Sequence, residues 1–181
     1  MNRRSGAAGR AQGALLIVAG AAIILGGVLM LSLAWGLQHA ALANPPLLGK
    51  TAPRLAIQTQ AGQQVRVWEL QGKPVVLNFW ASWCAPCIQE LPVLSDGAAA
   101  HPAVAFIGAD NQDTAAGFTS FEASHGHPYP AGPIVEGSYQ AYGVAGLPAT
   151  FFIDSGGHVA ASFSGPLDTS TLNHYLALIA S

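Results

Sequence analysis

Charge and cysteine are both scarce in this chain, and each shortage excludes a class of protein. Only 9% of the 181 residues are charged, against an ordinary ~25%, which argues against a disordered, self-repelling chain. Two cysteines are too few for a disulfide-stapled miniprotein or a four-cysteine zinc site. The net charge of −2 gives no reason to expect nucleic acid as a partner. The length allows one globular domain with an appendage.

The few charges are unevenly divided along the chain. Residues 1–49 carry three arginines and no acid, whereas residues 50–181 carry four basic residues and all nine acids. A run of 25 residues, Gly13 to Leu37, has no charge at all. As a helix rising ~1.5 Å per residue it would reach about 37 Å, enough to cross a hydrocarbon core ~30 Å thick. The sequence therefore predicts a membrane-spanning helix over residues 13–37, with the lipid bilayer as its partner.

The arginines predict the orientation of this span. All three precede it, and the next basic residue is Lys50, so residues 1–12 are expected in the cytoplasm. A cleaved signal peptide is the alternative, because Ala41-Leu42-Ala43 resembles a cleavage site, but such peptides have apolar cores of only ~7–15 residues. Either reading exports the rest of the chain. We expect a single-pass protein of the bacterial inner membrane whose C-terminal domain is periplasmic or otherwise extracytoplasmic.

The exported part has the pattern of an α/β domain. Residues 38–49 include Asn44-Pro45-Pro46 and predict a short linker, followed by a domain over residues 50–181. Continuous apolar runs predict buried strands, alternating runs predict a hairpin and an antiparallel partner strand, and helical spacing predicts two helices. In chain order the predicted elements are strands Leu55–Thr59, Val65–Val67, Val75–Trp80 and Val104–Ala109, helix Thr114–His125, strands Ala149–Ile153 and His158–Phe163, and a final helix capped by Asp168. This order predicts a mixed sheet flanked by helices.

The two cysteines stand at the junction between a strand and a helix. Cys84-Ala85-Pro86-Cys87 follows the strongest predicted strand directly. The N–H groups and dipole of a helix N-terminus favour a thiolate at Cys84, and the dipole alone lowers a thiol pKa by about one unit. Cys87, one turn later, is close enough to close an intramolecular disulfide. Pro86 falls in the first turn, where its missing N–H costs little.

Two other uses of the cysteines have less support in the sequence. A zinc site would need two more ligands, and His125 and His127 are the candidates, but they lie in a Gly/Pro-rich stretch without a ligand-spacing signature. A purely structural disulfide would close a very small loop and constrain the unfolded chain little. We therefore expect no metal and no cofactor.

Two segments resemble a known family. Residues 80–92, WASWCAPCIQELP, resemble the active-site segment of the thioredoxin-like TlpA/ResA/CcmG family of membrane-anchored thiol–disulfide oxidoreductases. Residues 143–154, GVAGLPATFFID, resemble that family's cis-proline segment and following strand. The resemblance runs from about Lys50 to the C-terminus and implies a thioredoxin-like fold preceded by one transmembrane helix.

The resemblance implies roles for the residues of the first segment. Cys84 is expected to be the exposed attacking cysteine and Cys87 the buried resolving one. Glu90 matches an acidic residue that tunes the pair, although an ordinary surface glutamate in a first helical turn is the alternative. Asn78 stands where thioredoxins have a buried Asp, which leaves Glu90 or water to accept a proton from Cys87. Trp83 is expected to shield the site, the alternative being a partly buried core aromatic.

The second segment is expected to bind the substrate. Pro148 matches the proline whose preceding peptide bond is cis and which faces the cysteines. Leu147 would then offer its backbone groups to an extended substrate segment, strand to strand.

The resemblance favours a reductase of exported protein disulfides, with apocytochrome c as one possible substrate. A reductase in an oxidising compartment needs electrons from across the membrane, and the family implies a donor of the DsbD/CcdA type. A disulfide-forming oxidase would use the same residues. A peroxiredoxin-type peroxidase has a Thr three residues before its reactive cysteine, where this chain has Ala81. A redox-inert binding domain is the remaining alternative, against which the intact cysteine pair argues.

Overall fold

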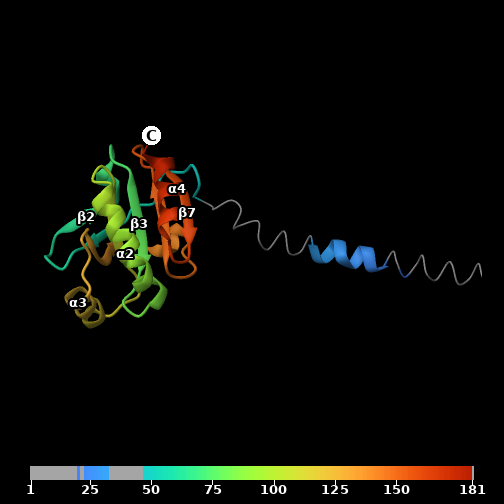
Figure 1. The fold of residues 1–181 in the computed structure, drawn as a ribbon, viewed down its shortest axis with the longest axis horizontal. Coiled ribbons are helices and arrows are strands. Elements are labelled where there is room, and N and C mark those ends of the chain that lie inside the picture. Colours follow the sequence, from blue (N-terminus) through green and yellow to red (C-terminus); the bar gives the residue numbers. More distant parts are fainter. Residues whose placement is uncertain (1–19, 21–22, 33–46, 181) are drawn as a thin grey trace, which may run out of the picture. The chain divides into compact units, whose positions relative to one another are not determined.

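The computed structural model describes residues 20, 23–32 and 47–180, which fall in two separate units, Met1–Asn44 and Pro45–Ser181 (Figure 1). In the first unit, residues 23–32 are helical. Within the described residues, no helix is both long and apolar enough to cross a membrane. The rest of the predicted span 13–37, residues 1–12 and most of the linker 38–49 lie outside the described residues.

The second unit is built on one seven-stranded mixed sheet in the order β2-β1-β5-β4-β3-β6-β7. Strands β3, β4 and β5 run parallel to one another, and the remaining neighbours pair antiparallel. Their bounds are β1 Ala56–Gln58, β2 Gln64–Arg66, β3 Val75–Trp80, β4 Ala105–Asp110, β5 Ala131–Glu136, β6 Ala149–Ile153 and β7 Val159–Ser164. The predicted mixed α/β sheet is confirmed.

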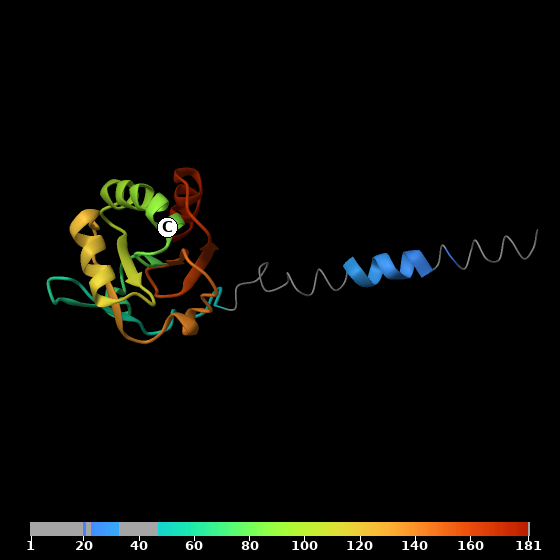
Figure 2. The same cartoon turned by 90° about the horizontal axis from the view of Figure 1, so that it is seen from below.

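Three α-helices and two short 3₁₀ helices complete this unit. They are α2 Ala85–Ala100, α3 Ala115–Ser124, α4 Thr169–Ile179, η1 Val67–Leu70 and η2 Tyr139–Tyr142. Figure 2 shows α2, in green, beside α4, in red, and the two are in contact. Apolar side chains of all three α-helices join one hydrophobic cluster, whereas η1 and η2 contribute to a second cluster. Both clusters consist of residues from 47 onward, so this domain has a complete core of its own.

Strand β3 positions the site because it is buried on both faces. Val76 and Trp80 belong to the cluster that contains the α-helices, and Val75, Leu77 and Phe79 to the other. This explains the continuous apolar run, since a central strand covered on both sides has no solvent face. Asn78 has the same strand parity as Val76 and Trp80, so its side chain turns toward α2.

The helix caps follow the prediction, and one strand was missed. Thr114 Oγ1 accepts from Gly117 N at 3.0 Å, and Asp168 Oδ1 accepts from Thr171 N at 2.7 Å. Strand β5 begins Ala-Gly-Pro, residues that are depleted in strands, and no alternation marked it. Gly132 is needed there because a Cβ would run into the backbone of Gln58 on β1. The close approach of β1 therefore explains why glycine stands in this strand, and the local strand propensities give no sign of it.

Candidate active site

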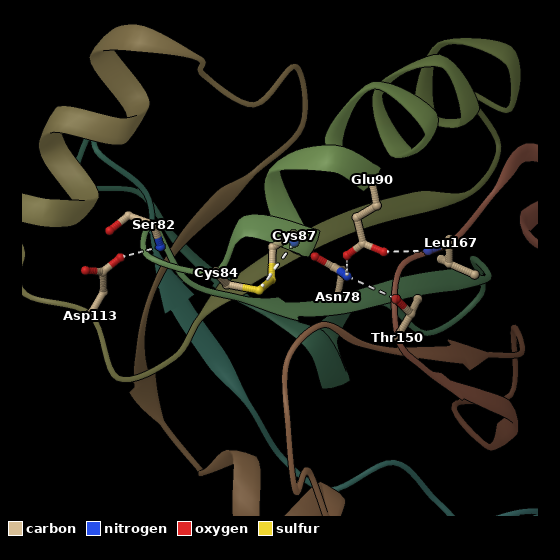
Figure 3. The surroundings of a disulfide bond; sticks show 8 residues. All are labelled: Asn78, Ser82, Cys84, Cys87, Glu90, Asp113, Thr150 and Leu167. Carbon is tan, nitrogen blue, oxygen red and sulfur yellow. Dashed lines mark hydrogen bonds between the residues drawn. A yellow bond between two sulfur atoms is a disulfide. The ribbon is translucent and has the colours of Figure 1, made fainter.

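Cys84 and Cys87 form a disulfide at the N-terminus of α2 (Figure 3). Their Cα atoms are 5.3 Å apart. Cys84 is the N-cap residue of the helix, and its Sγ accepts a hydrogen bond from Cys87 N at 3.3 Å. Pro86 lies in the first turn, where no intrahelical bond requires its N–H. The sulfur of Cys84 therefore already occupies the position at which a helix N-terminus stabilises negative charge.

The two cysteines do not differ in exposure in this oxidised state. Cys84 is 4% exposed and Cys87 is 5% exposed, so the expected exposed Cys84 is not seen. The disulfide holds both sulfurs over the first turn of α2, and both side chains belong to the cluster that also contains Trp80 and Leu91. A difference in access between the two sulfurs would have to arise when the bond opens.

Glu90 is a buried acid held by two donors. It is 1% exposed, Asn78 Nδ2 donates to its Oε1 at 2.8 Å, and Leu167 N donates to its Oε2 at 2.9 Å (Figure 3). Burial raises the pKa of Glu90 from 4.5 to about 7, although the two hydrogen bonds oppose that rise. The alternative of an ordinary surface glutamate is wrong, because the packing of α2 against the sheet and the loop before α4 covers this side chain.

Thr150 completes this polar group, and sequence reasoning missed it. Asn78 Nδ2 also donates to Thr150 Oγ1 at 3.0 Å, and all three side chains are buried. Thr150 lies opposite Asn78 in the antiparallel pairing of β3 with β6. The available signal was a hydroxyl residue inside an apolar strand run, because a buried hydroxyl needs a partner.

The proline segment lies beside the strand that leads to the cysteines. The Leu147–Pro148 peptide bond is cis, as the resemblance implies. Ala149 pairs with Phe79, which places Pro148 next to the end of β3. Pro148 O accepts from Gly165 N at 2.9 Å, whereas no backbone hydrogen bond joins Leu147 to another described residue.

Trp83 lies on the surface next to the cysteine pair. Its side chain is 60% exposed, and its Nε1 donates to Gln112 O at 3.4 Å. The alternative of a core aromatic is therefore wrong. One residue earlier, Ser82 N donates to Asp113 Oδ2 at 2.7 Å (Figure 3). These bonds tie the segment before Cys84 to the segment that follows β4.

The histidines considered as zinc ligands have other partners. His127 Nδ1 is hydrogen-bonded to Glu122 Oε1, and the His127 ring packs against Trp80 with centroids 4.5 Å apart. The ring of His125 stacks on Phe121. Across the part of the chain that the structure describes, no three His, Cys, Asp or Glu side chains are grouped to hold a metal ion.

Comparison with known proteins agrees with this geometry. The AhpC/TSA family pattern matches residues 48–162. The chain belongs to the AhpC/TSA family. It is 31% identical over 138 residues to the thiol-disulfide oxidoreductase ResA of Bacillus thuringiensis (strain Al Hakam), covering 73% of this chain and 78% of that protein. It is 33% identical over 129 residues to a DsbE homolog, a thiol:disulfide interchange protein of Paracoccus denitrificans (strain Pd 1222), covering 67% and 68%.

A solved structure supports the same assignment. The thiol:disulfide interchange protein DsbE from Chlorobium tepidum superposes with a TM-score of 0.68 at 26% identity, covering 74% of this chain and 98% of that one. This AhpC/TSA protein therefore has a thioredoxin-like fold and is a thiol–disulfide oxidoreductase of the ResA/DsbE type. Three residues before Cys84 its buried Ala81 has no side-chain hydroxyl to offer the sulfur.

Proposed function

We propose that this protein reduces disulfide bonds of exported proteins with a Cys84/Cys87 dithiol. The observation that carries the proposal is the Cys84–Cys87 disulfide at the N-terminus of α2, with the buried Glu90 on the same helix. No metal or cofactor enters the reaction, because thiol–disulfide exchange needs only the sulfur atoms and a proton acceptor.

The reaction begins with the reduced protein. The Cys84 thiolate attacks one sulfur of a substrate disulfide, a mixed disulfide forms, and the second substrate sulfur leaves as a thiolate that takes up a proton. Cys87 then loses its proton and attacks Sγ of Cys84. The bond between Cys84 and the substrate breaks, and the released substrate sulfur takes up a proton. The substrate leaves as a dithiol that has gained two electrons, and the protein, which has lost them, is left with the Cys84–Cys87 disulfide. This disulfide is the state described above.

Glu90 is proposed as the acceptor of the Cys87 proton. An ordinary thiol has a pKa of about 8.5, so Cys87 needs a base to react quickly near neutral pH. Burial raises the pKa of Glu90 to about 7. This value is closer to the pKa of the thiol than the pKa of an ordinary carboxyl group is. Asn78, which occupies the place of a thioredoxin Asp, cannot take up the proton in its place.

Leu147, Pro148 and Trp83 are proposed to bind the substrate. The backbone groups of Leu147, which form no backbone hydrogen bond with another described residue, suit an extended segment that adds to it as a strand would. The exposed ring of Trp83 offers apolar surface next to the disulfide. Pro148 directly follows Leu147, and its own carbonyl is already bound to Gly165 N.

The N-terminal segment is proposed to anchor the domain at the bacterial inner membrane. Residues 1–12 would lie in the cytoplasm, residues 13–37 in the bilayer, and the domain beyond the linker 38–49 in the periplasm or its equivalent. Electrons would come from a membrane donor of the DsbD/CcdA type, since an oxidising compartment does not keep a dithiol reduced. The anchor would hold the domain close to that donor and raise its effective concentration. Apocytochrome c is one substrate to test.

Insulin reduction by the dithiothreitol-reduced protein tests the proposal, with Cys84→Ser as the control that must be inactive.

The direction follows from the reduction potential, since a value near the ~−270 mV of thioredoxin indicates a reductant and one near the ~−120 mV of DsbA an oxidant. Cys87→Ser should accumulate mixed disulfides with the physiological substrates, which identifies them. A protein that reduces no disulfide in the first assay would overturn the proposal.

A further inference from the structure

Within the part of the chain that the structure describes, the carboxyl group of Glu90 is hydrogen-bonded only to N–H donors. Both carboxylate oxygens of Glu90 face N–H donors, Asn78 Nδ2 at 2.8 Å and Leu167 N at 2.9 Å. These donors suit an ionised carboxylate, which only accepts. A protonated Glu90 would turn an O–H toward a donor unless one partner rearranged. A buried polar group without a partner costs about 1–3 kcal/mol, so such a rearrangement matters.

Asn78 can rearrange without changing shape. Its amide group carries NH₂ on one side and an oxygen of similar size on the other, and half a turn about the Cβ–Cγ bond exchanges the two. After that turn, Oδ1 stands where Nδ2 stood, within reach of both Glu90 and Thr150. Leu167 cannot do this, because its donor is a backbone N–H.

Thr150 serves both orientations of the amide. Its Oγ1 now accepts from Asn78 Nδ2 at 3.0 Å. A hydroxyl also donates, so the same oxygen can offer its hydrogen to Asn78 Oδ1 after the turn. Thr150 is fully buried in β6, so bulk water does not reach this hydroxyl. A residue with only a donor or only an acceptor at this place would favour one orientation.

We infer that Asn78 and Thr150 are positioning residues that form a hydrogen-bond switch around Glu90. The amide nitrogen of Asn78 faces an ionised Glu90, and the amide oxygen faces a protonated one. The meaning of this switch for the reaction rests on the proposed function, in which Glu90 takes the proton of Cys87. The proton leaves Sγ of Cys87 and arrives on Oε1 of Glu90, and no electron moves in that step.

The same turn serves the cysteine. Figure 3 shows the amide oxygen of Asn78 on the side of the disulfide, while its nitrogen faces Glu90 and Thr150. Half a turn brings the NH₂ group to the disulfide side, where it can donate a hydrogen bond to a Cys87 thiolate. One orientation of Asn78 therefore suits a Cys87 thiol beside an ionised Glu90. The other orientation suits a Cys87 thiolate beside a protonated Glu90.

Three kinds of titratable group near Glu90 do not titrate near neutral pH. The cysteines on its own helix do not titrate while they are joined as a disulfide. Burial, and after it the charge of Glu90, raises the pKa of Tyr129 above its ordinary value of 10. Asp168, next to Leu167, is exposed, and hydrogen bonds from Thr171 and Ser170 lower its pKa. Burial first, and then the charges of Asp113 and Glu122, also raise the pKa of Asp110 to about 7, so the titration of Glu90 is followed through its own ¹³C-labelled carboxyl group.

Thr150→Val tests the inference, with Thr150→Ser as the matched control. Valine keeps the branched shape and removes the hydroxyl, which leaves one N–H of Asn78 unpaired when Glu90 is ionised. The midpoint of Glu90, read from its ¹³C-labelled carboxyl group in the oxidised domain 45–181, should rise by about one pH unit. Serine keeps the hydroxyl and should titrate with the midpoint of the unsubstituted protein. Equal midpoints in all three proteins overturn the inference.

The side-chain NH₂ signals of Asn78 provide a second test that needs no substitution at Thr150. In the unsubstituted oxidised domain they should shift with pH at the midpoint of Glu90, because the NH₂ group changes partners there. In Glu90→Gln they should stay constant, because the carboxamide must give its oxygen to Leu167 N and turn its NH₂ toward Asn78. Signals that do not follow Glu90 contradict the switch.

Neither measurement depends on catalysis. If the signals follow Glu90 in a protein that reduces no disulfide, the proposed function fails and the switch stands. If insulin is reduced while the Asn78 signals ignore Glu90, the switch fails and the proposed function stands.

Discussion

The backbone N–H of Leu167 donates to Oε2 of Glu90 across 2.9 Å, which joins α2 to the loop that leads into α4. The helix that begins at the disulfide thus carries a buried acid held from a distant part of the domain. The donor is a backbone group, so it persists with any residue other than proline at position 167. Substitution of Glu90 itself is therefore the direct way to examine this contact.

Glu90→Gln should weaken the dependence of stability on pH. Burial raises the pKa of Glu90 in the folded state from 4.5 to about 7, so between these values the folded protein binds more protons than the unfolded chain. The free energy of unfolding consequently falls as the pH rises through this window. The share of Glu90 in this fall is on the order of 3 kcal/mol, and Glu90→Gln should remove it. Urea unfolding of the oxidised domain from pH 4.5 to pH 7.5 measures the difference.

Asp110 provides the matched comparison for that measurement. Burial first, and then the charges of Asp113 and Glu122, raise its pKa to about 7. Asp110→Asn should therefore remove a similar share of the dependence, and the double variant should have the flattest profile. Parallel profiles for the unsubstituted protein and Glu90→Gln would contradict the raised pKa of Glu90.

Glu90→Gln should also change the reaction of Cys87. Without a carboxylate to accept its proton, Cys87 should need a higher pH to attack a mixed disulfide at Cys84, with the rate near pH 7 about 10²-fold lower. Release of a chromophoric thiol from such a mixed disulfide, followed by stopped flow between pH 5 and pH 9, gives the profile. Glu69→Gln, an exposed acid on η1, is the control. An unchanged profile would remove Glu90 from the mechanism.

Much of the fold and the cysteine pair could be predicted because local patterns encode them. The apolar run of β3, broken only by Asn78, and the caps at Thr114 and Asp168 are local signals, and the structure has them at those residues. The burial of Glu90 could not be read locally, since the N–H of Leu167 that covers it lies 77 residues away. Thr150 and Asn78 are 72 residues apart, and only the antiparallel pairing of β3 with β6 brings them together.

Gly132→Ala should destabilise the domain. A Cβ at this position would overlap the backbone of Gln58, and a backbone cannot move aside as the end of a side chain can. Pairing of β1 with β5 should loosen, and the free energy of unfolding should fall by about 2 kcal/mol or more. Gly146→Ala is the control, because nothing lies within 4 Å of its Cβ position. Thermal unfolding of both variants decides, and equal losses would contradict the close approach at Gly132.

Trp83→Ala should impair substrate use without unfolding the domain. The ring is 60% exposed, so its removal should change the melting temperature little. The value of kcat/KM for insulin should fall about tenfold, as expected when an aromatic residue that binds a partner is truncated. Oxidised glutathione, which is too small to cover the ring, should lose much less. Leu178→Ala, an exposed apolar side chain on α4, is the control, and an equal loss for both substrates would contradict a role in protein binding.

The full chain, expressed in a bacterium with a C-terminal tag, should stay in the membrane fraction after carbonate extraction. The uncharged run of 25 residues is long enough to span the bilayer, and its three preceding arginines favour a cytoplasmic N-terminus. In spheroplasts the outer face of the inner membrane is exposed, so added protease should digest the domain. Leu25→Arg, which places a charge in the middle of the run, should weaken membrane retention. A soluble periplasmic product that begins just after Ala43 would instead identify a cleaved signal peptide.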